Sequence, residues 1–517
     1  MLALATLAGR RYFRISMSEN GQTGARARGS LQGMSGQLDG DVCYRALCAR
    51  DGRFDGVWFV GVTSTGVYCR PVCRARTPRR DRCEFYPSAA AAERRGYRPC
   101  LRCRPELAPG RAPVDAATRV AAAVAGRIAE GALNERGVDE LAAQFHLSAR
   151  QLRRIVERSL GVAPIALAQT QRLLHAKMML TDSTLPIVEV ALASGFASVR
   201  RFNALFRSRY GLVPSALRRA PTAAASDTVR CLLAYRPPLA FAQLLDYLRA
   251  RCYHGAEVIT ADSYRRAIEL DGRRGIICVT KAADSEHLVL TASAELAKVL
   301  PRLVLRVRQL FDLDAEPAQI GACLAGDSIL APQLAANPGL RVPGALSGFE
   351  LALRAVLGQQ VSVRAATTLA GRLVAAFGTA LPDALAAPGL THSTPTAARL
   401  AEARVEDIAA IGLPRRRAEC VRALAAALLT GQLRLRPGED VAQVVAALLE
   451  LPGVGPWTAE YIAMRALRCP DAFPAGDLGI QRALGVRRAR DAESRAEAWR
   501  PFRAYAVMHL WDSLGPP

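Results

Sequence analysis

Two stretches of this sequence repeat each other without a gap, and they limit the possible folds more than any other feature. RQLRRIVERSLGVAPIAL begins at Arg150, and RRFNALFRSRYGLVPSAL begins at Arg200. The matched apolar residues recur at steps of three and four, which is the spacing of one face of an α-helix. Each copy then reaches a glycine that favours a turn. The sequence therefore predicts two amphipathic helices, each closed by a glycine turn.

A shorter helix is expected in front of each copy. Residues 138–145 lead through a turn to Ser148, which forms a capping box with Gln151, and residues 187–193 lead through a turn to Ser198, a second N-cap. A short helix, a turn and a longer basic helix are typical of helix-turn-helix units. A plain helical bundle can imitate one such pattern, but two copies favour a DNA-binding pair.

This pair of units resembles the AraC-type DNA-binding domain. The resemblance implies that the two longer helices read successive faces of the major groove. The arginines on their polar faces are Arg150, Arg153, Arg154, Arg200, Arg201 and Arg207. Among these, Arg150, Arg153, Arg200 and Arg201 are the candidate DNA contacts.

Four cysteines stand in two closely spaced pairs. VYCRPVC holds Cys69 and Cys73, and YRPCLRC holds Cys100 and Cys103. The chain has 13 cysteines, an odd number, and those after Cys103 are scattered singly, which is typical of a reduced, cytoplasmic protein. In such a compartment the two pairs have the spacing of a tetrahedral zinc site with four thiolates.

A purely structural zinc is the alternative, but arginines surround the two pairs and favour a site that approaches phosphates. These arginines are Arg70, Arg74, Arg76, Arg98 and Arg102. Cys43, Cys48 and Cys83 stand outside the spacing and are interpreted as spare thiols. Spacing alone does not say which of the four thiolates would react.

DGRFDGVWFVGVTSTGVYCRPVCRAR and FYPSAAAAERRGYRPCLRC resemble the amino-terminal zinc module of Ada-type methyl-sensing activators. The resemblance implies that Cys69 accepts a methyl group from a methylphosphotriester in DNA, once per molecule, and that Thr65, Arg76 and Arg98 contact phosphates. Zinc would keep the thiol deprotonated, and a thiolate is the nucleophile that methyl displacement requires. Because methylation removes one negative charge near phosphates, it is expected to raise affinity for DNA. The family's usual methyltransferase part, with Pro-Cys-His-Arg, is absent from this sequence.

A glycine-rich segment, LPGVGPWTA, contains Gly453 and Gly455. These glycines allow a tight turn between two helices, whose exposed amides can hold a DNA phosphate. Asp477 follows in FPAGDLGI. A lone aspartate before a helix is more often an N-cap than a catalyst, but its pairing with the hairpin favours a catalytic role.

The carboxy-terminal half, from LAYRPPLAF through AVLGQQVSV, resembles the helix-hairpin-helix DNA glycosylases and, within them, the AlkA-like 3-methyladenine glycosylases. The resemblance implies that Asp477 stabilises an oxocarbenium-like sugar or activates water as a flipped base leaves. The positions that match the family's aromatic pocket are Trp457, Tyr461, Trp511 and Tyr247, and those that match its wedge are Gln359 and Gln360. Ordinary core packing is the alternative for the aromatic residues.

An aromatic cage favours a cationic base, and N-alkylated purines are cationic. Flipping is also least costly for damaged bases. Relatives with lyase activity carry a lysine where Trp457 stands, and no lysine follows Lys298. They often carry a four-cysteine iron–sulfur cluster too, whereas Cys469 is the last cysteine here. A monofunctional glycosylase that leaves an intact abasic strand is therefore expected.

The net charge of +23 predicts an acidic partner, with nucleic acid as the first choice. The basic residues are nearly all arginine and alanine is abundant, so a GC-rich genome is an alternative source of the charge. The sequence has no uncharged apolar run of the about 18 residues that a membrane helix requires. The first residues do not form a secretory signal.

The expected fold class is a mainly α multidomain chain. Its expected parts are a disordered tail (1–40), a small zinc-bound α/β module (41–110), an AraC-type double helix-turn-helix (115–220), a small TBP-like α+β subdomain (228–310) and an all-α helix-hairpin-helix glycosylase domain (311–517). The expected cofactors are one zinc ion and a monovalent cation at the hairpin. The expected partners of this cytoplasmic monomer are alkylated and promoter double-stranded DNA and RNA polymerase, with no membrane.

The expected function is a bifunctional alkylation response, in which one chain senses methylphosphotriesters, activates transcription and excises alkylated purines. The first alternative is a regulator whose glycosylase-like part only binds DNA. The second is a repair enzyme whose zinc is purely structural.

Overall fold

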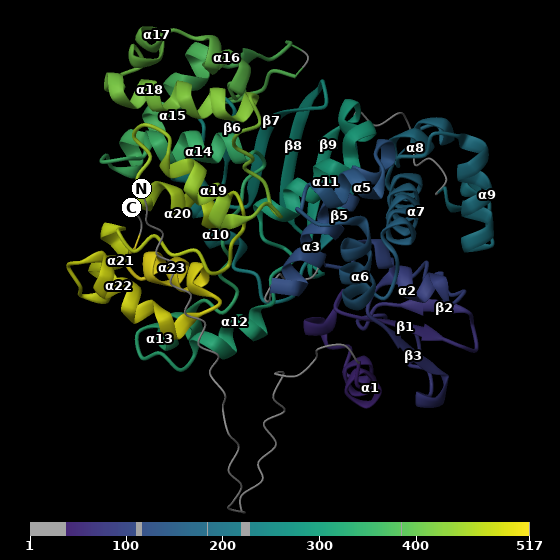
Figure 1. Cartoon of the computed structure of the whole chain (residues 1–517). Coiled ribbons are helices and arrows are strands. Elements are labelled where there is room, and N and C mark those ends of the chain that lie inside the picture. The colour runs from purple at the N-terminus through teal and green to yellow at the C-terminus, as the bar shows by residue number, and fades with distance from the viewer. Residues whose placement is uncertain (1–37, 110–115, 184, 219–227, 384, 516–517) are drawn as a thin grey trace, which may run out of the picture. The chain divides into compact units, whose positions relative to one another are not determined.

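The computed structural model describes residues 38–109, 116–183, 185–218, 228–383 and 385–515 (Figure 1). Most of the expected tail, residues 1–37, lies outside these ranges. Within them, no helix combines the length and the apolar character that a bilayer crossing requires. The predicted class, a multidomain and mainly helical chain, is confirmed.

The first described part is a small α/β module. Its elements are α1 (Gly40–Cys48), β1 (Phe59–Val62), β2 (Val67–Cys69), β3 (Cys83–Tyr86), α2 (Ala89–Arg94) and β4 (Arg98–Pro99). The sheet has the order β3-β1-β2-β4, and β2 and β4 run parallel, with Val67 opposite Arg98. Because both strands run the same way, the cysteines at their carboxyl ends, Cys69 and Cys100, come together.

The next part contains the repeated helices. Its elements are α3 (Ala116–Ala129), α4 (Ala132–Glu135), α5 (Val138–Ala143), α6 (Ala149–Leu160), α7 (Pro164–Asp182), α8 (Ile187–Ala193) and α9 (Val199–Tyr210). The predicted capping box between Ser148 and Gln151 is confirmed, and the Ser198 side chain caps α9. Gly161 and Gly211 close the two long helices at φ 75° and 66°, where a residue without Cβ is favoured. The helix-turn-helix prediction is therefore confirmed, including the residues that cap the two long helices.

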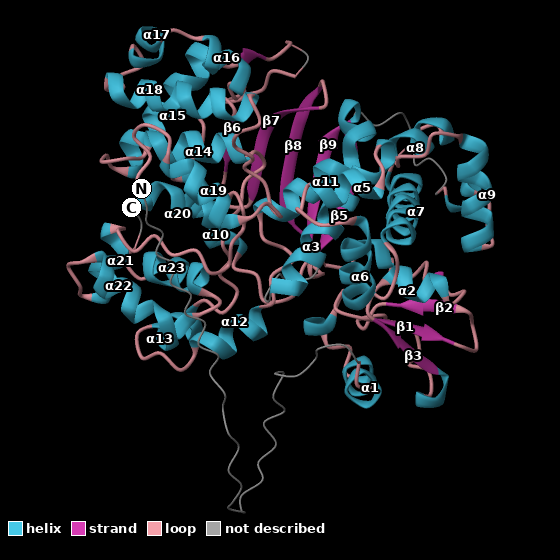
Figure 2. Cartoon of the chain, viewed as in Figure 1, coloured by secondary structure: helices cyan, strands magenta, loops and turns pink. Residues whose placement is uncertain are grey.

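A five-stranded antiparallel sheet follows (Figure 2). Its elements are β5 (Thr228–Ala234), α10 (Phe241–Arg249), β6 (Glu257–Ile259), β7 (Ser263–Leu270), β8 (Arg273–Lys281), β9 (His287–Ser293) and α11 (Leu300–Leu310). The strand order is β5-β9-β8-β7-β6. The buried aromatic residues of α9, among them Phe202 and Phe206, belong to the same hydrophobic cluster as Leu233 and Leu290 of this sheet. The second helix-turn-helix and the sheet thus share one core, which the sequence had not indicated.

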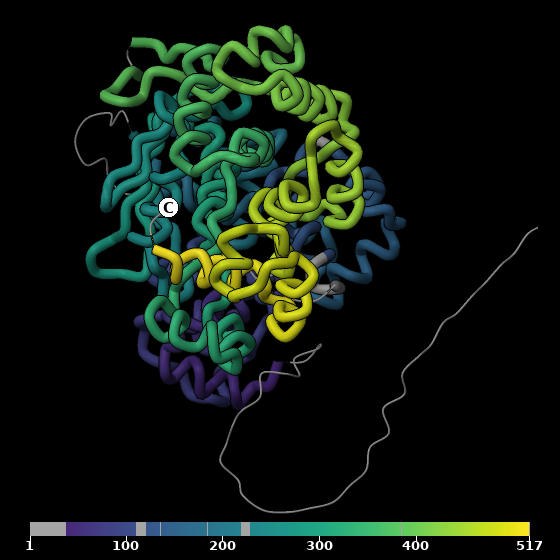
Figure 3. Tube along the Cα trace, turned by 90° about the vertical axis from the view of Figure 1, so that its left-hand side faces the viewer, coloured from purple at the N-terminus to yellow at the C-terminus, as the bar shows by residue number. Residues whose placement is uncertain are grey.

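The last part is almost entirely helical. Its elements are α12 (Pro317–Leu324), α13 (Leu330–Ala336), α14 (Gly348–Leu357), α15 (Val363–Phe377), β10 (Thr379–Ala380), β11 (His392–Ser393), α16 (Ala397–Glu402), α17 (Val405–Ala409), α18 (Arg415–Leu429), α19 (Val441–Leu449), α20 (Pro456–Arg465), α21 (Leu478–Leu484), α22 (Ala489–Ala496) and α23 (Arg503–Asp512). Helix α14 packs against α20, and α13 packs against α23, so segments far apart in the sequence lie side by side (Figure 3).

The segment that follows Cys103 begins at Arg104, and its first residues pack against α7. Glu106 is buried and accepts hydrogen bonds from Lys177 of α7 at 2.6 Å and from Arg104 at 2.9 Å. Arg104 also pairs with Asp182 at the end of α7, at 2.8 Å. These ion pairs hold the end of the α/β module against the long helix that links the two helix-turn-helix units.

A second buried carboxyl, that of Glu93, joins the same two parts. It accepts hydrogen bonds from the hydroxyls of Tyr68 at 3.0 Å and Thr170 at 2.8 Å. Burial raises the pKa of Glu93 from 4.5 to about 7, although the two hydroxyls oppose the shift. Below about pH 7 the protonated form therefore predominates in the folded chain.

Glu93→Gln is expected to become more stable relative to the wild type as the pH rises. Because the pKa of Glu93 is raised on folding, its favourable contribution is complete below pH 4.5 and is lost as the pH rises through 7. The neutral amide does not titrate, so the difference in free energy of unfolding should change by about 3 kcal/mol over this range. Urea unfolding of both proteins at a series of pH values measures it, and a constant difference would contradict the expectation.

Candidate functional site

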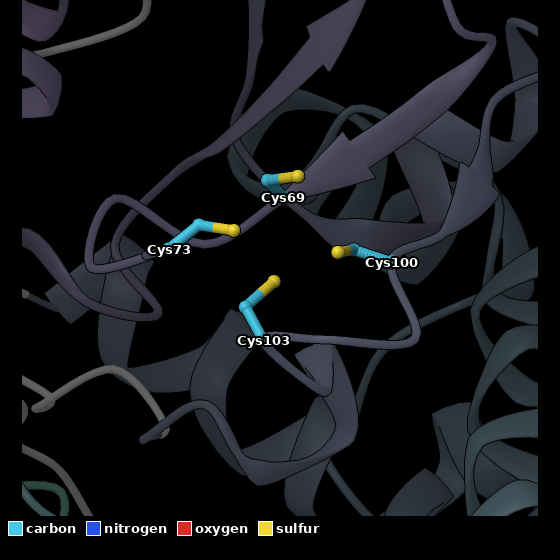
Figure 4. Close-up of side chains that lie close together, drawn as sticks. All are labelled: Cys69, Cys73, Cys100 and Cys103. Atoms are coloured by element: carbon cyan, nitrogen blue, oxygen red, sulfur yellow. The ribbon is translucent and has the colours of Figure 1, made fainter. Parts of the chain in front are cut away.

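The four predicted zinc ligands converge at one end of the small sheet. The sulfur atoms of Cys69, Cys73, Cys100 and Cys103 all lie within 4.8 Å of one another and point toward a common centre (Figure 4). A tetrahedral zinc with Zn–S bonds of about 2.3 Å holds its sulfur atoms about 3.8 Å apart. The donor set and its spacing therefore fit zinc. The thiol of Cys83 does not join this cluster and donates a hydrogen bond to the backbone carbonyl of Arg79.

Arg70 supports this cluster from inside the module. It is buried, its Nε donates to Asp55 at 2.8 Å, and its Nη1 donates to the carbonyl of Cys103 at 3.1 Å. Arg70 was grouped by sequence with arginines that approach phosphates. That interpretation is wrong for Arg70, because a buried guanidinium paired with a carboxylate is not available to DNA.

Backbone amides distinguish the four sulfur atoms. The amide of Arg70 donates to Cys103 Sγ at 3.4 Å. Backbone hydrogen bonding from Ala75 lowers the pKa of Cys73, and that from Cys103 lowers the pKa of Cys100. Within residues 38–109 we find no corresponding amide on Cys69. A hydrogen bond to a thiolate stabilises its charge and lowers its nucleophilicity, so these amides restrain Cys73, Cys100 and Cys103.

The predicted phosphate contacts of this module are on the surface. Thr65, Arg76 and Arg98 are all exposed. Arg98 lies opposite Val67 on the neighbouring strand, two residues before Cys69. Neither arginine forms an ion pair among the described residues, so both are free to meet an anion beside the thiolate cluster.

The predicted contacts of the helix-turn-helix units are also on the surface. Arg150 and Arg153 on α6, and Arg200 and Arg201 on α9, are exposed. In the described part of the chain none of them pairs with a carboxylate. The apolar faces of both helices are buried, so these arginines form the outward faces of the two units.

The predicted hairpin joins α19 and α20. Gly453 is exposed and adopts φ 82°, and Gly455 is the N-cap of α20. Over the described ranges the amides of both glycines lack a backbone acceptor. Free amides at the start of a helix are suited to bind a phosphate.

The two predicted wedge residues have different surroundings. Gln359 is turned toward the hairpin, and its amide donates to the carbonyl of Gly453 at 2.9 Å and to Thr458 at 3.0 Å. Gln360 is exposed at φ 54°, a conformation that side chains rarely adopt. Gln360 is therefore the residue that projects from the turn after α14, whereas Gln359 braces the hairpin.

Asp477 is a helix cap and a part of an aromatic pocket at once. As the N-cap of α21, its Oδ1 accepts from the amide of Ile480 at 3.0 Å. The same oxygen accepts from the indole N–H of Trp511 at 3.0 Å, and Oδ2 accepts from that of Trp457 at 2.9 Å. Three hydrogen bonds thus fix the carboxylate, so the two interpretations of this aspartate do not exclude each other.

The four predicted aromatic residues form a continuous cluster around this carboxylate. Trp457 stacks on Tyr461 with ring centroids 5.5 Å apart, and Trp511 lies 6.2 Å from both Tyr461 and Tyr247. The hydroxyls of Tyr247 and Tyr461 are 3.3 Å apart. Tyr461 is buried, while the tryptophans and Tyr247 are only partly buried. The cluster therefore combines core packing with accessible ring surface.

Two arginines of this cluster were missed by sequence reasoning. Arg465 Nη1 donates to the Tyr461 hydroxyl at 2.6 Å, and the Arg251 guanidinium lies 3.8 Å from the centre of the Tyr247 ring. Each follows its tyrosine by four residues. Arg465 therefore lies on the same face of α20 as Tyr461, whereas Arg251 lies in the turn that follows α10. That spacing was the signal that could have found them.

Sequence models of four families match the chain. Their descriptions are metal binding domain of Ada (residues 42–106), helix-turn-helix domain (141–220), AlkA N-terminal domain (230–347) and HhH-GPD superfamily base excision DNA repair protein (353–502). Together they cover most of the described chain, while α3, α4 and α23 lie outside the matched ranges.

Known proteins match over the same parts. The chain is 41% identical to a probable bifunctional transcriptional activator/DNA repair enzyme AlkA of Mycobacterium tuberculosis, over 93% of this chain and 97% of the relative. It is 33% identical to DNA-3-methyladenine glycosylase 2 of Escherichia coli, over 55% of this chain and 97% of the relative. It is 44% identical to the bifunctional enzyme Ada of Escherichia coli, over 14% of this chain and 20% of the relative.

The match to the mycobacterial relative runs through all four domains and covers nearly the whole of both chains. The metal-binding and glycosylase domains that match this chain explain why it carries both a thiolate cluster and an aromatic pocket. The chain therefore belongs to the AlkA-type family of bifunctional transcriptional activators and DNA repair enzymes.

Proposed function

We propose that this chain excises alkylated purines such as 3-methyladenine from DNA. The observation that carries the proposal is the carboxylate of Asp477, which two indole N–H groups fix at the edge of an aromatic cluster. A flipped base would stack on the rings of Trp457, Tyr461 and Trp511, which places its sugar near the carboxylate. Positive charge develops on the sugar as the bond breaks, and Asp477 would stabilise it.

The surrounding elements would hold the DNA for this step. The amides of Gly453 and Gly455 would bind a phosphate, and Gln360 would enter the space that the flipped base leaves. Trp457 stands where a lysine would be required for strand cleavage through a Schiff base. The expected product is therefore an intact strand with an abasic site.

We propose further that Cys69 accepts a methyl group from a methylphosphotriester. Zinc, when bound, keeps the four thiols deprotonated. Arg76 and Arg98 would hold the phosphate, and Cys69 has fewer amide hydrogen bonds than its neighbours. The thiolate would attack the methyl carbon, and the electrons of the breaking C–O bond would return to the phosphate oxygen. The triester thus becomes an ordinary charged phosphodiester.

One preparation can test both activities. The protein is incubated with methylated duplex DNA, the released bases are separated, and the intact protein is then analysed by mass spectrometry. A free alkylated base together with one added methyl group on the protein supports the proposal. Binding of DNA without any released base would favour a regulator whose glycosylase-like part only binds DNA.

Four further expectations remain predictions. They are a cytoplasmic location, RNA polymerase as a partner, a monomeric state and a monovalent cation at the hairpin.

Methylation of Cys69 is expected to raise affinity for promoter DNA, and salt should diminish the gain. The reason is that the thiolate cluster loses one negative charge beside DNA phosphates. Binding of methylated and unmethylated protein across a salt series measures this. Equal affinity of the two forms at every salt concentration would count against an electrostatic switch.

The same assay locates the residues that read the promoter. Arg153→Ala or Arg200→Ala should weaken binding by about 1–3 kcal/mol if each arginine reaches a base, and should do so equally for all sequences if it reaches only phosphate. Arg158→Ala is a matched control, because Arg158 is exposed in the last turn of α6, away from the end that enters the groove.

A further inference from the structure

The two cysteine pairs of the thiolate cluster are held in different ways. Cys100 and Cys103 lie at the ends of one short loop (Figure 4). The backbone carbonyl of Cys103 accepts a hydrogen bond from Arg70 at 3.1 Å, and that of Cys100 accepts one from the ammonium of Lys177 at 3.4 Å. Both donors are buried. Among the residues that the structure describes, no side-chain cation donates to a carbonyl of the first pair, which contains the proposed methyl acceptor. Two buried cations therefore anchor only the second pair.

Lys177 belongs to a different part of the chain. It lies in α7, which links the two helix-turn-helix units, and its relative exposure is 2%. Its ammonium also pairs with Glu106 at 2.6 Å. Glu106 and Cys100 both belong to the α/β module, and no other acceptor of this ammonium is found in the described ranges. The buried charge of Lys177 is therefore directed entirely at the module that contains the thiolate cluster.

The anchored loop matters most after methyl transfer. A methylated Cys69 is a thioether, which is neutral and binds a metal ion more weakly than a thiolate does. Three thiolates must then hold the zinc, and Cys100 and Cys103 supply two of them. Groups that orient metal ligands from behind typically change metal affinity by about 10- to 100-fold. The loop that Lys177 holds is therefore the part of the site on which zinc retention depends.

We propose that Lys177 is a positioning residue of the thiolate cluster, which acts through the backbone carbonyl of Cys100 and keeps zinc bound after Cys69 is methylated. The inference rests on the proposed methyl transfer and adds to that site a residue of the helix-turn-helix part. Lys177 contacts no substrate. Because it lies on α7, the binding of zinc and the folding of this helix should stabilise each other, since coupling between two sites is reciprocal.

Lys177→Met tests the proposal in the full chain, because methionine keeps much of the apolar stem and lacks the ammonium. Zinc affinity, measured by competition with a chelator, should fall at least about tenfold. The methylated variant should also release zinc faster than the methylated wild type. Lys298→Met is the matched control, since Lys298 is exposed and pairs with Glu189 at 3.3 Å. This control should retain zinc as the wild type does.

A second variant separates this effect from a loss of fold. Lys177→Met leaves the buried carboxylate of Glu106 with Arg104 alone, which costs stability whatever the role of Lys177. Glu106→Gln in the same chain removes that charge. The urea midpoint of the double variant should therefore return toward that of the wild type, whereas its zinc affinity should stay low. A double variant whose zinc affinity also returns to the wild-type value would overturn the positioning role.

Two further measurements do not depend on methyl transfer. Co²⁺ in place of zinc absorbs visible light according to its coordination geometry, so its spectrum should differ between the double variant and the wild type and be unchanged in Lys298→Met. Removal of zinc should speed amide hydrogen exchange in α7 of the wild type, and should do so less in the double variant.

Two results would overturn the proposal. One is an unchanged Co²⁺ spectrum in the double variant, and the other is hydrogen exchange in α7 that does not respond to the removal of zinc. A wild type that binds zinc but accepts no methyl group would instead overturn methyl transfer itself. The chelator competition and the Co²⁺ spectrum would then still decide whether Lys177 positions the cluster.

Discussion

Asp477→Asn is expected to abolish the release of 3-methyladenine while the binding of abasic DNA stays largely intact. The carboxylate stabilises charge that exists on the sugar only as the bond breaks, so its loss should appear in the chemical step and not in ground-state binding. We expect the single-turnover rate to fall by about 10³-fold or more. The carbonyl oxygen of asparagine can still cap α21, which separates charge from fold.

The hydrogen bonds of Asp477 call for one further control. An asparagine side chain has a single acceptor oxygen, so its NH2 group would face the indole N–H of either Trp457 or Trp511. Two donors would then face each other, and that hydrogen bond would be lost. Trp457→Phe removes the same hydrogen bond but keeps the carboxylate. If charge is the cause, this variant should retain far more activity than Asp477→Asn. An asparagine variant that works at nearly the wild-type rate would reduce Asp477 to a helix cap.

The helix-turn-helix pair was predictable because its signals are local. Ser148, Gln151 and Ser198 act on amides within one helical turn, and Gly161 and Gly211 end their helices through their own backbone conformation. Such interactions depend on nearest neighbours in the sequence, so they can be inferred from spacing. The zinc quartet was predictable for a similar reason, since each half of it lies in one short loop.

Contacts between distant segments could not be predicted in this way. Glu93 accepts a hydrogen bond from Thr170, and Glu106 accepts one from Lys177, although more than a full helix-turn-helix unit separates each pair in the sequence. The shared core of α9 and the five-stranded sheet has the same origin. Their partners are decided by packing, and the polar residues involved look like ordinary surface residues in the sequence.

The two candidate sites were each only partly predictable from the sequence. The sequence indicated the residues of the pocket but not that Asp477 bonds to both tryptophans, because indole orientation follows from tertiary packing. Likewise the spacing of four cysteines could not select Cys69. The proposed selection of Cys69 rests on which sulfur atoms the backbone amides reach, and only the folded loops determine this.

Cys69→Ser is expected to lose methyl transfer from methylphosphotriesters completely. A serine hydroxyl stays protonated at neutral pH and is a far weaker nucleophile than a thiolate. The other three cysteines should not replace Cys69, because amide hydrogen bonds stabilise their charge. Loss of one of four zinc ligands should also weaken zinc retention, which a competing chelator measures separately from methyl transfer.

Cys83→Ser is the matched control for this experiment, because Cys83 belongs to the same module but its sulfur faces the carbonyl of Arg79 instead of the cluster. This variant should keep its zinc and accept one methyl group at Cys69. Peptide mapping of methylated wild type, Cys69→Ser and Cys83→Ser gives the position of the methyl group directly. A methyl group on Cys73, Cys100 or Cys103 would contradict the selection by backbone amides. A Cys69→Ser protein that still accepts a methyl group would contradict it as well, since the remaining thiolates would then be nucleophilic enough to react.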